Sequence, residues 1–251
     1  MRRAILVFAL AAPLIVIALW RLSPGAAISV LALSHALLLY PTLRPNVQWL
    51  GPVVTNFHTE GRELWLTIDD GPTGDTLALL DLLERRKAKA TFFVKGKLAL
   101  ENPGLIREMV ARGHSVANHS QTHPSGSFWC LGPRRIAGEI DACNAELATI
   151  TGIEPQWFRA PVGMKNPFVH PILDRRGMTL IGWSGRGFDA TMSNAEGVLR
   201  RLMPHIYPGA VIVLHQGREW SLRVIERVIA EMQDRGYEFV IPDQSRLKTK
   251  R

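Results

Sequence analysis

Residues 64–72 read Leu-Trp-Leu-Thr-Ile-Asp-Asp-Gly-Pro, a short apolar run that ends in two carboxylates and a turn. An apolar run of this length is typical of a buried strand, and the Gly-Pro pair ends it. The same pattern recurs along the chain. Six further runs are predicted to be buried strands, at residues 90–94, 115–117, 156–158, 179–182, 210–214 and 238–241.

Amphipathic stretches separate these runs and are predicted to be helices. They cover residues 76–86, 103–112, 134–151, 167–176, 194–205 and 220–235. Gly113, Gly177 and Gly236 stand where helix C-caps are expected. Strands and helices that alternate about seven times predict an α/β fold with a parallel sheet, either a barrel or a doubly wound sheet.

Ionisable residues follow the predicted strands. They are Asp69, Asp70, His119, Arg159, Asp189 and His215. Because the carboxyl ends of parallel strands meet at one edge of a sheet or barrel, we expect these side chains to surround one site. Adjacent carboxylates, several histidines and an arginine are the groups that a metal-dependent hydrolase needs.

The two histidines of residues 119–123 are candidate metal ligands. His119 and His123 are four residues apart, so one helical turn or a tight loop brings both imidazoles to one side. A carboxylate completes a three-ligand site, and both Asp69 and Asp70 are candidates. Neighbouring residues that leave a strand point in different directions, so one can bind metal while the other faces substrate. Such a set suits Zn²⁺, Fe²⁺, Co²⁺ or Mn²⁺, and the sequence does not choose among them.

Five segments together resemble the motifs of the polysaccharide deacetylase family, the chitooligosaccharide-deacetylase-like carbohydrate esterases. They are residues 67–72 (Thr-Ile-Asp-Asp-Gly-Pro), 119–123 (His-Ser-Gln-Thr-His), 159–163 (Arg-Ala-Pro-Val-Gly), 183–190 (Trp-Ser-Gly-Arg-Gly-Phe-Asp-Ala) and 214–215 (Leu-His). The resemblance covers roughly residues 60 to 245. It implies a distorted (β/α) barrel of about seven parallel strands.

The resemblance implies a metal site beside a general base. Asp70, His119 and His123 would bind one divalent ion, with zinc expected and cobalt, manganese, iron or nickel as alternatives. Asp69 would be the general base, and Arg159 would orient it and keep it ionised. The ion would acidify the attacking water and polarise the amide carbonyl.

The resemblance also implies a general acid and a substrate cleft. His215 would protonate the departing amine, and Asp189 would hold its imidazole charged. The metal and a backbone N–H of residues 159–163 would hold the oxyanion. The residues expected to contact substrate are Pro161, Val162, Trp183, Arg186 and Leu214.

The chain departs from the family pattern at three positions. Val162 stands where the family usually has Tyr, which suggests a more apolar cleft wall. Arg186 replaces an Asp and Ala190 replaces a Trp in the fourth motif. Arg186 is expected to be either a salt-bridged surface residue or a ligand for an anionic substrate group. Three further cations near predicted strand ends favour a phosphate-bearing substrate, namely Lys165, His170 and Arg218.

The amino-terminal region is apolar. Residues 4–20 carry no charge and residues 26–43 only His35, and each run is near the ~20 residues that span a bilayer. We expect a membrane-associated helical region at 1–45 and a catalytic domain at 46–251. The region is either a hairpin that spans twice, a single anchor followed by an interfacial or buried helix, or a cleaved signal peptide. A cytoplasmic amino terminus, favoured by Arg2 and Arg3, places the domain in the cytoplasm after two spans and outside after one.

The chain is basic, with a net charge of +8. No nucleic-acid-binding motif is present, so anionic membrane lipid, in a bacterial inner membrane, is the expected partner. Basic residues crowd the carboxyl terminus at Arg246, Lys248, Lys250 and Arg251. Cys130 and Cys143 make no metal-binding pattern.

These observations predict a membrane-attached hydrolase acting on carbon–nitrogen bonds other than peptide bonds. Its substrate would be an N-acylated, in the first place N-acetylated, amino sugar in a glycan or lipid-linked sugar. Two other classes compete. A catalytically silent glycan-binding module is opposed by the complete set of ionisable residues. A non-haem iron oxygenase, which also uses two histidines and a carboxylate, is opposed by the alternation of strands and helices.

Overall fold

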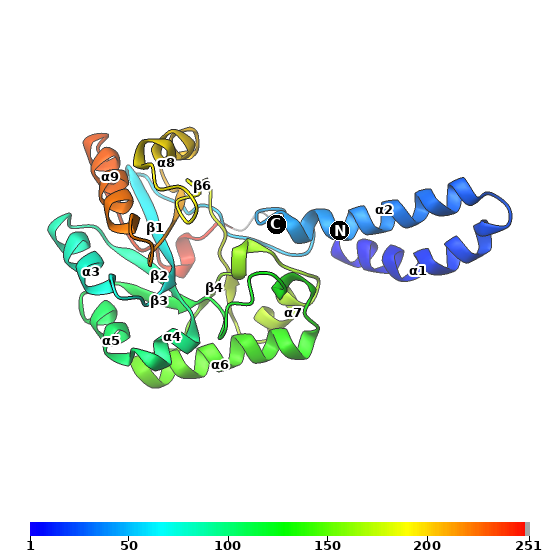
Figure 1. The fold of residues 1–251 in the computed structure, drawn as a ribbon, viewed down its shortest axis with the longest axis horizontal. Helices are drawn as coiled ribbons and strands as arrows, with labels where there is room; N and C mark the ends of the chain where they lie inside the picture. Colours follow the sequence, from blue (N-terminus) through cyan, green and yellow to red (C-terminus); the bar gives the residue numbers. More distant parts are fainter. Residues whose placement is uncertain (249–251) are drawn as a thin grey trace.

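The computed structural model describes residues 1–248, and Lys250 and Arg251 of the basic carboxyl terminus lie outside this range. A long helical hairpin projects from a rounded α/β domain (Figure 1). Its helices, α1 (Arg2–Trp20) and α2 (Pro24–Leu43), run antiparallel and pack on one another. Both were predicted, and each begins two residues earlier than expected. Ser23 caps α2 by accepting a hydrogen bond from the Ala26 N–H.

One curled parallel sheet forms the α/β domain. Among residues 1–248 its main path runs in the order β5-β4-β3-β2-β1-β7-β6, and β8 pairs with the start of β1. The two edge strands of this path do not pair with each other in the described sheet, so the barrel is distorted and open, as predicted. The strands are β1 (Glu63–Gly71), β2 (Ala90–Val94), β3 (Ser115–Asn118), β4 (Trp157–Phe158), β5 (Thr179–Leu180), β6 (Gly185–Arg186), β7 (Val211–His215) and β8 (Glu238–Phe239).

Helices cover the outer face of the curl (Figure 1). They are α3 (Thr76–Arg85), α4 (Gly96–Glu101), α5 (Pro103–Ala111), α6 (Pro133–Thr151), α7 (Val169–Asp174), α8 (Ala195–Leu202) and α9 (Ser221–Asp234). Short 3₁₀ turns lie at Phe128–Cys130, Pro161–Gly163, Met203–His205 and Gln244–Arg246. The parallel strands and covering helices differ from the jelly roll that an oxygenase of this ligand type usually has.

The alternation of side chains along β1 decides where the site lies. Leu64, Leu66 and Ile68 pack outward with residues of α3 and α9, whereas Trp65 belongs to a second apolar cluster inside the curl. Side chains of a strand alternate between its faces, so Asp69 shares the inner face with Trp65. The first carboxylate of the motif is thereby placed inside the barrel.

Most predicted elements are confirmed, and the differences have local causes. Residues 194–205 form α8 only as far as Leu202, because Pro204 follows and the chain continues as a 3₁₀ turn. Strand β6 and helix α4 were not predicted, since neither contains an apolar run of sufficient length. Gly113, Gly177 and Gly236 adopt positive φ after their helices, as the C-cap prediction requires.

Candidate active site

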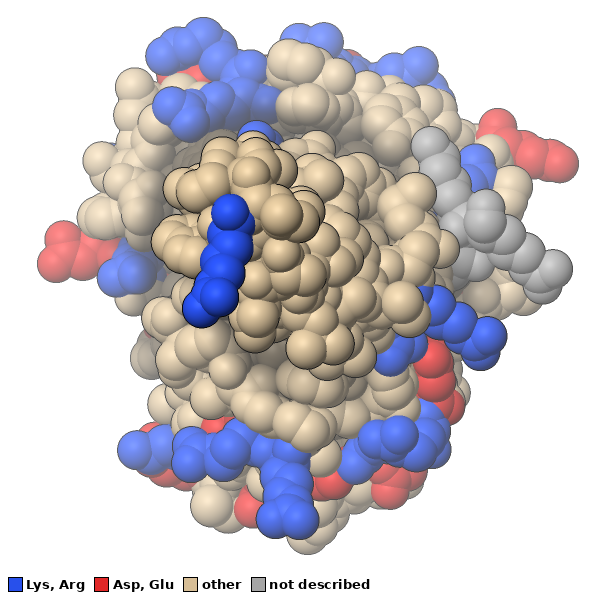
Figure 2. Space-filling view, turned by 90° about the vertical axis from the view of Figure 1, so that its right-hand side faces the viewer, with Lys and Arg blue, Asp and Glu red and all other residues tan. Residues whose placement is uncertain are grey.

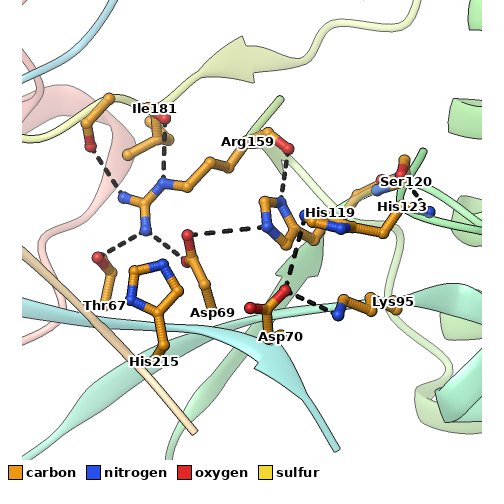
Figure 3. A network of polar contacts seen from close by, with 12 residues as sticks. Thr67, Asp69, Asp70, Lys95, His119, Ser120, His123, Arg159, Ile181 and His215 are labelled. Carbon is orange, nitrogen blue, oxygen red and sulfur yellow. Dashed lines mark hydrogen bonds and ion pairs between the residues drawn. The ribbon is translucent and has the colours of Figure 1, made fainter. Parts of the chain in front are cut away.

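Asp69 and Arg159 form a buried ion pair on the inner face of the curl (Figure 3). Arg159 Nη1 lies 2.7 Å from Asp69 Oδ1 and 2.8 Å from Thr67 Oγ1. The other guanidinium nitrogens donate to the carbonyls of residues 181 and 182. Only 1% of Arg159 and 3% of Asp69 are exposed, so this pair is fixed in position and shielded from water.

Asp70 points to a different group of partners. Its φ of 77° lies in the left-handed region, and the register between β1 and β2 shifts between Asp69 and Gly71. This irregularity turns the Asp70 carboxylate towards Lys95 and His123, whose terminal nitrogens lie 2.8 and 3.6 Å from Oδ1. The two adjacent carboxylates thus have different partners, Arg159 for Asp69 and Lys95 for Asp70.

The two histidines of the site lie on a tight loop after β3, not on a helix. Ser120 and His123 both have positive φ. The Asn118 side chain accepts a hydrogen bond from the Ser120 N–H at 2.7 Å. Glu139 of α6 accepts hydrogen bonds from the N–H and hydroxyl of Thr122 at 2.8 and 2.6 Å. This strained backbone persists because neighbouring polar groups hold it in place.

His119 is oriented for metal binding by its second ring nitrogen. Nδ1 lies 2.8 Å from the carbonyl oxygen of Arg159, so it donates a proton there and leaves Nε2 free to bind (Figure 3). A hydrogen bond of this type fixes the tautomer and orientation of a ligating histidine. The residue that pairs with the expected base therefore also positions a metal ligand through its backbone.

The donor set of Asp70, His119 and His123 fits a divalent transition metal. One ligand atom from each residue lies within 4.8 Å of the others. The buried Oδ1 of Asp70 already pairs with one cation, the Lys95 ammonium at 2.8 Å, and it faces His123. Two imidazoles and one carboxylate leave further coordination positions open.

The protonation of these ligands also suits metal binding. Burial lowers the pKa of His119 and lowers the pKa of His123 to about 3, so both imidazoles are neutral near pH 7. Burial alone would raise the pKa of Asp70, but the charge and hydrogen bond of the Lys95 ammonium help to hold that pKa below its usual range. The carboxylate is therefore ionised and the histidines are neutral, which is the form that binds metal.

His215 faces the same site from the end of β7. It is the register partner of Asp69 in the parallel pair. Its Nδ1 lies 3.0 Å from Asp189 Oδ1, and its backbone N–H donates to Asp189 Oδ2 at 2.6 Å. Burial alone would lower the pKa of His215, but the hydrogen bond with Asp189 and the charge of that carboxylate raise it above its ordinary value. The expected partnership of His215 with Asp189 is present.

These groups surround one cavity of about 350 Å³. Of the residues expected to contact substrate, Val162, Trp183 and Arg186 line it. The other two do not. Pro161 is buried in the 3₁₀ turn that carries Val162, and Leu214 packs in the outer core between sheet and helices.

Arg186 lies in the cavity and not in a surface salt bridge. The guanidinium carbon is 5.2 Å from the ring centre of Trp183 and 4.6 Å from that of Phe188. Its buried Nε finds no hydrogen-bond partner among residues 1–248. The carboxylates of Asp69 and Asp189 pair instead with Arg159 and His215.

Two cations expected near the substrate lie elsewhere. Lys165 is fully buried, and its ammonium donates to the carbonyls of Arg44 and Pro45 at 3.0 and 2.7 Å. Lys165 thereby holds the segment that follows α2. His170 is buried against Gly51. Arg218 lines the cavity, as the sequence suggested.

Lys95 lines the cavity and was missed by the sequence analysis. It follows β2 directly, so the rule that found the other residues at strand ends could have found it. Glu139 was also missed. It lies inside the long amphipathic stretch of α6, and nothing in the local sequence shows that it holds the histidine loop.

Comparison with known proteins places the chain in a family. A sequence model described as polysaccharide deacetylase matches residues 57–181. The chain is 32% identical over 193 residues to a chitooligosaccharide deacetylase of Bradyrhizobium sp., covering 70% of this chain and 87% of the relative. The chain belongs to the polysaccharide deacetylase family. The predicted family is thereby confirmed, and the named relatives are deacetylases, which are hydrolases of non-peptide carbon–nitrogen bonds.

Other members of the polysaccharide deacetylase family are longer. The chain is 29% identical over 184 residues to the peptidoglycan-N-acetylglucosamine deacetylase PgdA of Listeria monocytogenes, which aligns 73% of this chain but only 38% of PgdA. Deacetylases of the family use a divalent metal, and the Asp70, His119 and His123 cluster is a fitting site for one.

Solved structures of the family share this fold. A family 4 carbohydrate esterase from Streptomyces lividans in complex with acetate superposes with a TM-score of 0.68 at 29% identity, covering 76% of this chain and 98% of that one. A family 4 pseudoenzyme from Bacillus anthracis superposes with a TM-score of 0.67 at 26% identity, covering 74% and 65%. The fold therefore occurs with and without activity, and the side chains of the site must carry the functional argument.

Proposed function

We propose that the protein is a metal-dependent hydrolase that removes the N-acyl group, in the first place N-acetyl, from an amino sugar in a glycan or a lipid-linked sugar. One observation carries this proposal. Asp70, His119 and His123 line the same cavity as Asp69 and His215. His215 is bound to Asp189. This arrangement supplies a metal site, a base and an acid around a single space for the amide.

The residues of the chain divide the work of amide hydrolysis. A divalent ion held by Asp70, His119 and His123 would acidify water and polarise the acyl carbonyl. Asp69 accepts the proton of the attacking water, and its ion pair with Arg159 holds the carboxylate in place. His215, kept protonated by Asp189, delivers a proton to the departing sugar amine. A backbone N–H of the loop that carries Val162 stabilises the oxyanion.

We also propose that residues 1–45 attach the catalytic domain, residues 46–251, to a membrane. Both hairpin helices are long and apolar enough to cross a bilayer, and few of their residues are buried. Apolar side chains such as Leu10, Leu14 and Ile28 are more than half exposed. In the view along the hairpin, Lys and Arg side chains outnumber the Asp and Glu side chains that lie among them around it (Figure 2). This distribution suits anionic headgroups around an inserted hairpin.

An assay of acyl release from a substrate panel tests the proposal. Purified full-length protein, loaded with zinc in detergent, is incubated with N-acetylated and N-formylated glycans and lipid-linked amino sugars. Liberated acetate, formate and free amine are then measured. We expect release from at least one amino sugar and none from an O-acetylated control that lacks the amide. Tight binding of a glycan without release would instead identify a catalytically silent binding module.

A further inference from the structure

The side chain of Arg186 is held in the cavity without an acidic partner. Strand β6 pairs with β7 so that Arg186 stands beside Val213, and both residues line the cavity. The rings of Trp183 and Phe188 hold the guanidinium at 5.2 and 4.6 Å, which fixes its plane. Its Nε is buried without a hydrogen-bond partner among the described residues. A buried donor without a partner indicates an acceptor that the protein itself does not supply.

The charges around the cavity favour an anion. Its lining includes three side chains with a permanent positive charge, Lys95, Arg186 and Arg218, against the two carboxylates of Asp69 and Asp70. The charge of Asp69 is neutralised by Arg159, which is buried and does not line the cavity. The charge of Asp70 is neutralised by Lys95. Among residues 1–248, neither Arg186 nor the exposed Arg218 forms an ion pair with a carboxylate, and the neighbouring Asp189 pairs with His215.

We propose that Arg186, assisted by Arg218, forms a subsite for an anionic group of the substrate close to the scissile amide. The group is a carboxylate or a phosphate, because a planar guanidinium donates two parallel hydrogen bonds to either. This assignment rests on the proposed amide hydrolysis and names its substrate class as an acidic N-acyl amino sugar. The carboxylate belongs to an acidic sugar, and the phosphate to a glycosyl phosphate, free or lipid-linked.

Three small substrates that differ in charge test the subsite. They are methyl N-acetylglucosaminide, which is neutral, N-acetylglucosamine 1-phosphate and N-acetylmuramic acid, which carries a carboxylate. For the wild type we expect a higher kcat/KM on at least one anion than on the neutral sugar. Arg186→Ala should lower kcat/KM on that anion by roughly 10- to 100-fold, as expected for loss of a charge-assisted bidentate contact, and should spare the neutral sugar.

Two further variants separate binding from folding. Arg200→Ala removes an exposed arginine of α8 that does not line the cavity, and it should leave all three rates unchanged. Arg186→Lys keeps the charge but loses the planar pair of donors, so it should retain part of the preference. Added salt should reduce the ratio of kcat/KM on the anionic substrate to kcat/KM on the neutral substrate in the wild type. Equal loss on all three substrates in Arg186→Ala, or no anion preference in the wild type, would overturn the subsite.

The result also separates the two proposals. If the wild type releases no acyl group from any substrate, amide hydrolysis fails and the subsite is decided by calorimetry on zinc-loaded protein. Tighter binding of N-acetylglucosamine 1-phosphate than of the neutral glycoside, lost in Arg186→Ala, would support the subsite. Equal affinities would refute it. A preference confined to the phosphate or to the carboxylate identifies the source of the anion.

Discussion

Asp69 and Asp70 are neighbours in sequence with different surroundings, and their roles can be separated by mutation. Asp69 pairs with buried Arg159, whereas Asp70 belongs to the metal cluster. Asp69→Asn should keep the metal and lower turnover by about 10²–10⁴-fold, the usual cost of removing a general base. Metal analysis by mass spectrometry together with acyl release measures both effects. Loss of the metal from Asp69→Asn would show that the two roles are reversed.

His215 should set the alkaline limit of activity. Its pKa is raised by Asp189, so the protonated acid is present below that raised pKa and is lost as the pH rises through it. Asp189→Asn removes the carboxylate, which should move the alkaline limb of the kcat profile to lower pH. A pH series of initial rates on both proteins shows the shift. An unmoved limb would mean that His215 is not the group that titrates there.

At the scale of single residues, the identity of the site residues was easier to predict than the direction in which each side chain points. The rule that functional groups follow parallel strands located Asp69, His119, Arg159 and His215. It could not foresee the positive φ of Asp70, because that depends on an irregular pairing with β2. Side-chain direction also decided which expected substrate contacts reach the cavity. Leu214 alternates to the outer face of β7, so Val213 lines the cavity in its place.

At the scale of elements, the predicted strands and helices were mostly confirmed because their apolar periodicity is strong. Strand β6 is only two residues long and begins with glycine, so it has no alternation of apolar and polar residues from which it could be predicted. The contact between α2 and the domain was also not predictable. It depends on Lys165, which the sequence analysis placed near the substrate but which is fully buried.

Lys165 should fasten the segment after α2 to the domain. Its ammonium donates to the Arg44 and Pro45 carbonyls, and Asn46 Nδ2 donates to the Trp183 carbonyl at 2.6 Å. Lys165→Ala removes two charge-assisted hydrogen bonds and leaves a cavity, at a cost of roughly 2–4 kcal/mol. We expect faster cleavage between residues 44 and 52 by proteinase K, mapped by mass spectrometry.

A matched variant controls for loss of a lysine. Lys97 is exposed on α4, so Lys97→Ala should leave the cleavage rate unchanged. Cleavage of Lys165→Ala at the wild-type rate would show that the buried ammonium does not hold this segment.

The whole molecule joins an apolar hairpin to an α/β domain, and labelling of a natural thiol tests the proposed membrane attachment and its side. Two antiparallel spans return the domain to the side of the amino terminus, which Arg2 and Arg3 favour as cytoplasmic. Cys130 is exposed and Cys143 is buried. A membrane-impermeant maleimide should therefore label Cys130 only after cells are lysed.

Cys130→Ser controls this experiment, since it should abolish labelling if Cys143 is inaccessible. Labelling of Cys130 in intact cells would contradict the two-span arrangement. It would place the domain outside, where assembled glycans are found.

The most direct test of the central claim is a metal titration of the whole enzyme. Wild-type protein is stripped with a chelator, and acyl release is followed as zinc is added. We predict no release without metal, a rise that ends at about one equivalent, as expected for one three-ligand site, and much weaker zinc binding by Asp70→Asn. Full acyl release by metal-free protein, or zinc binding unaffected in Asp70→Asn, would contradict the account.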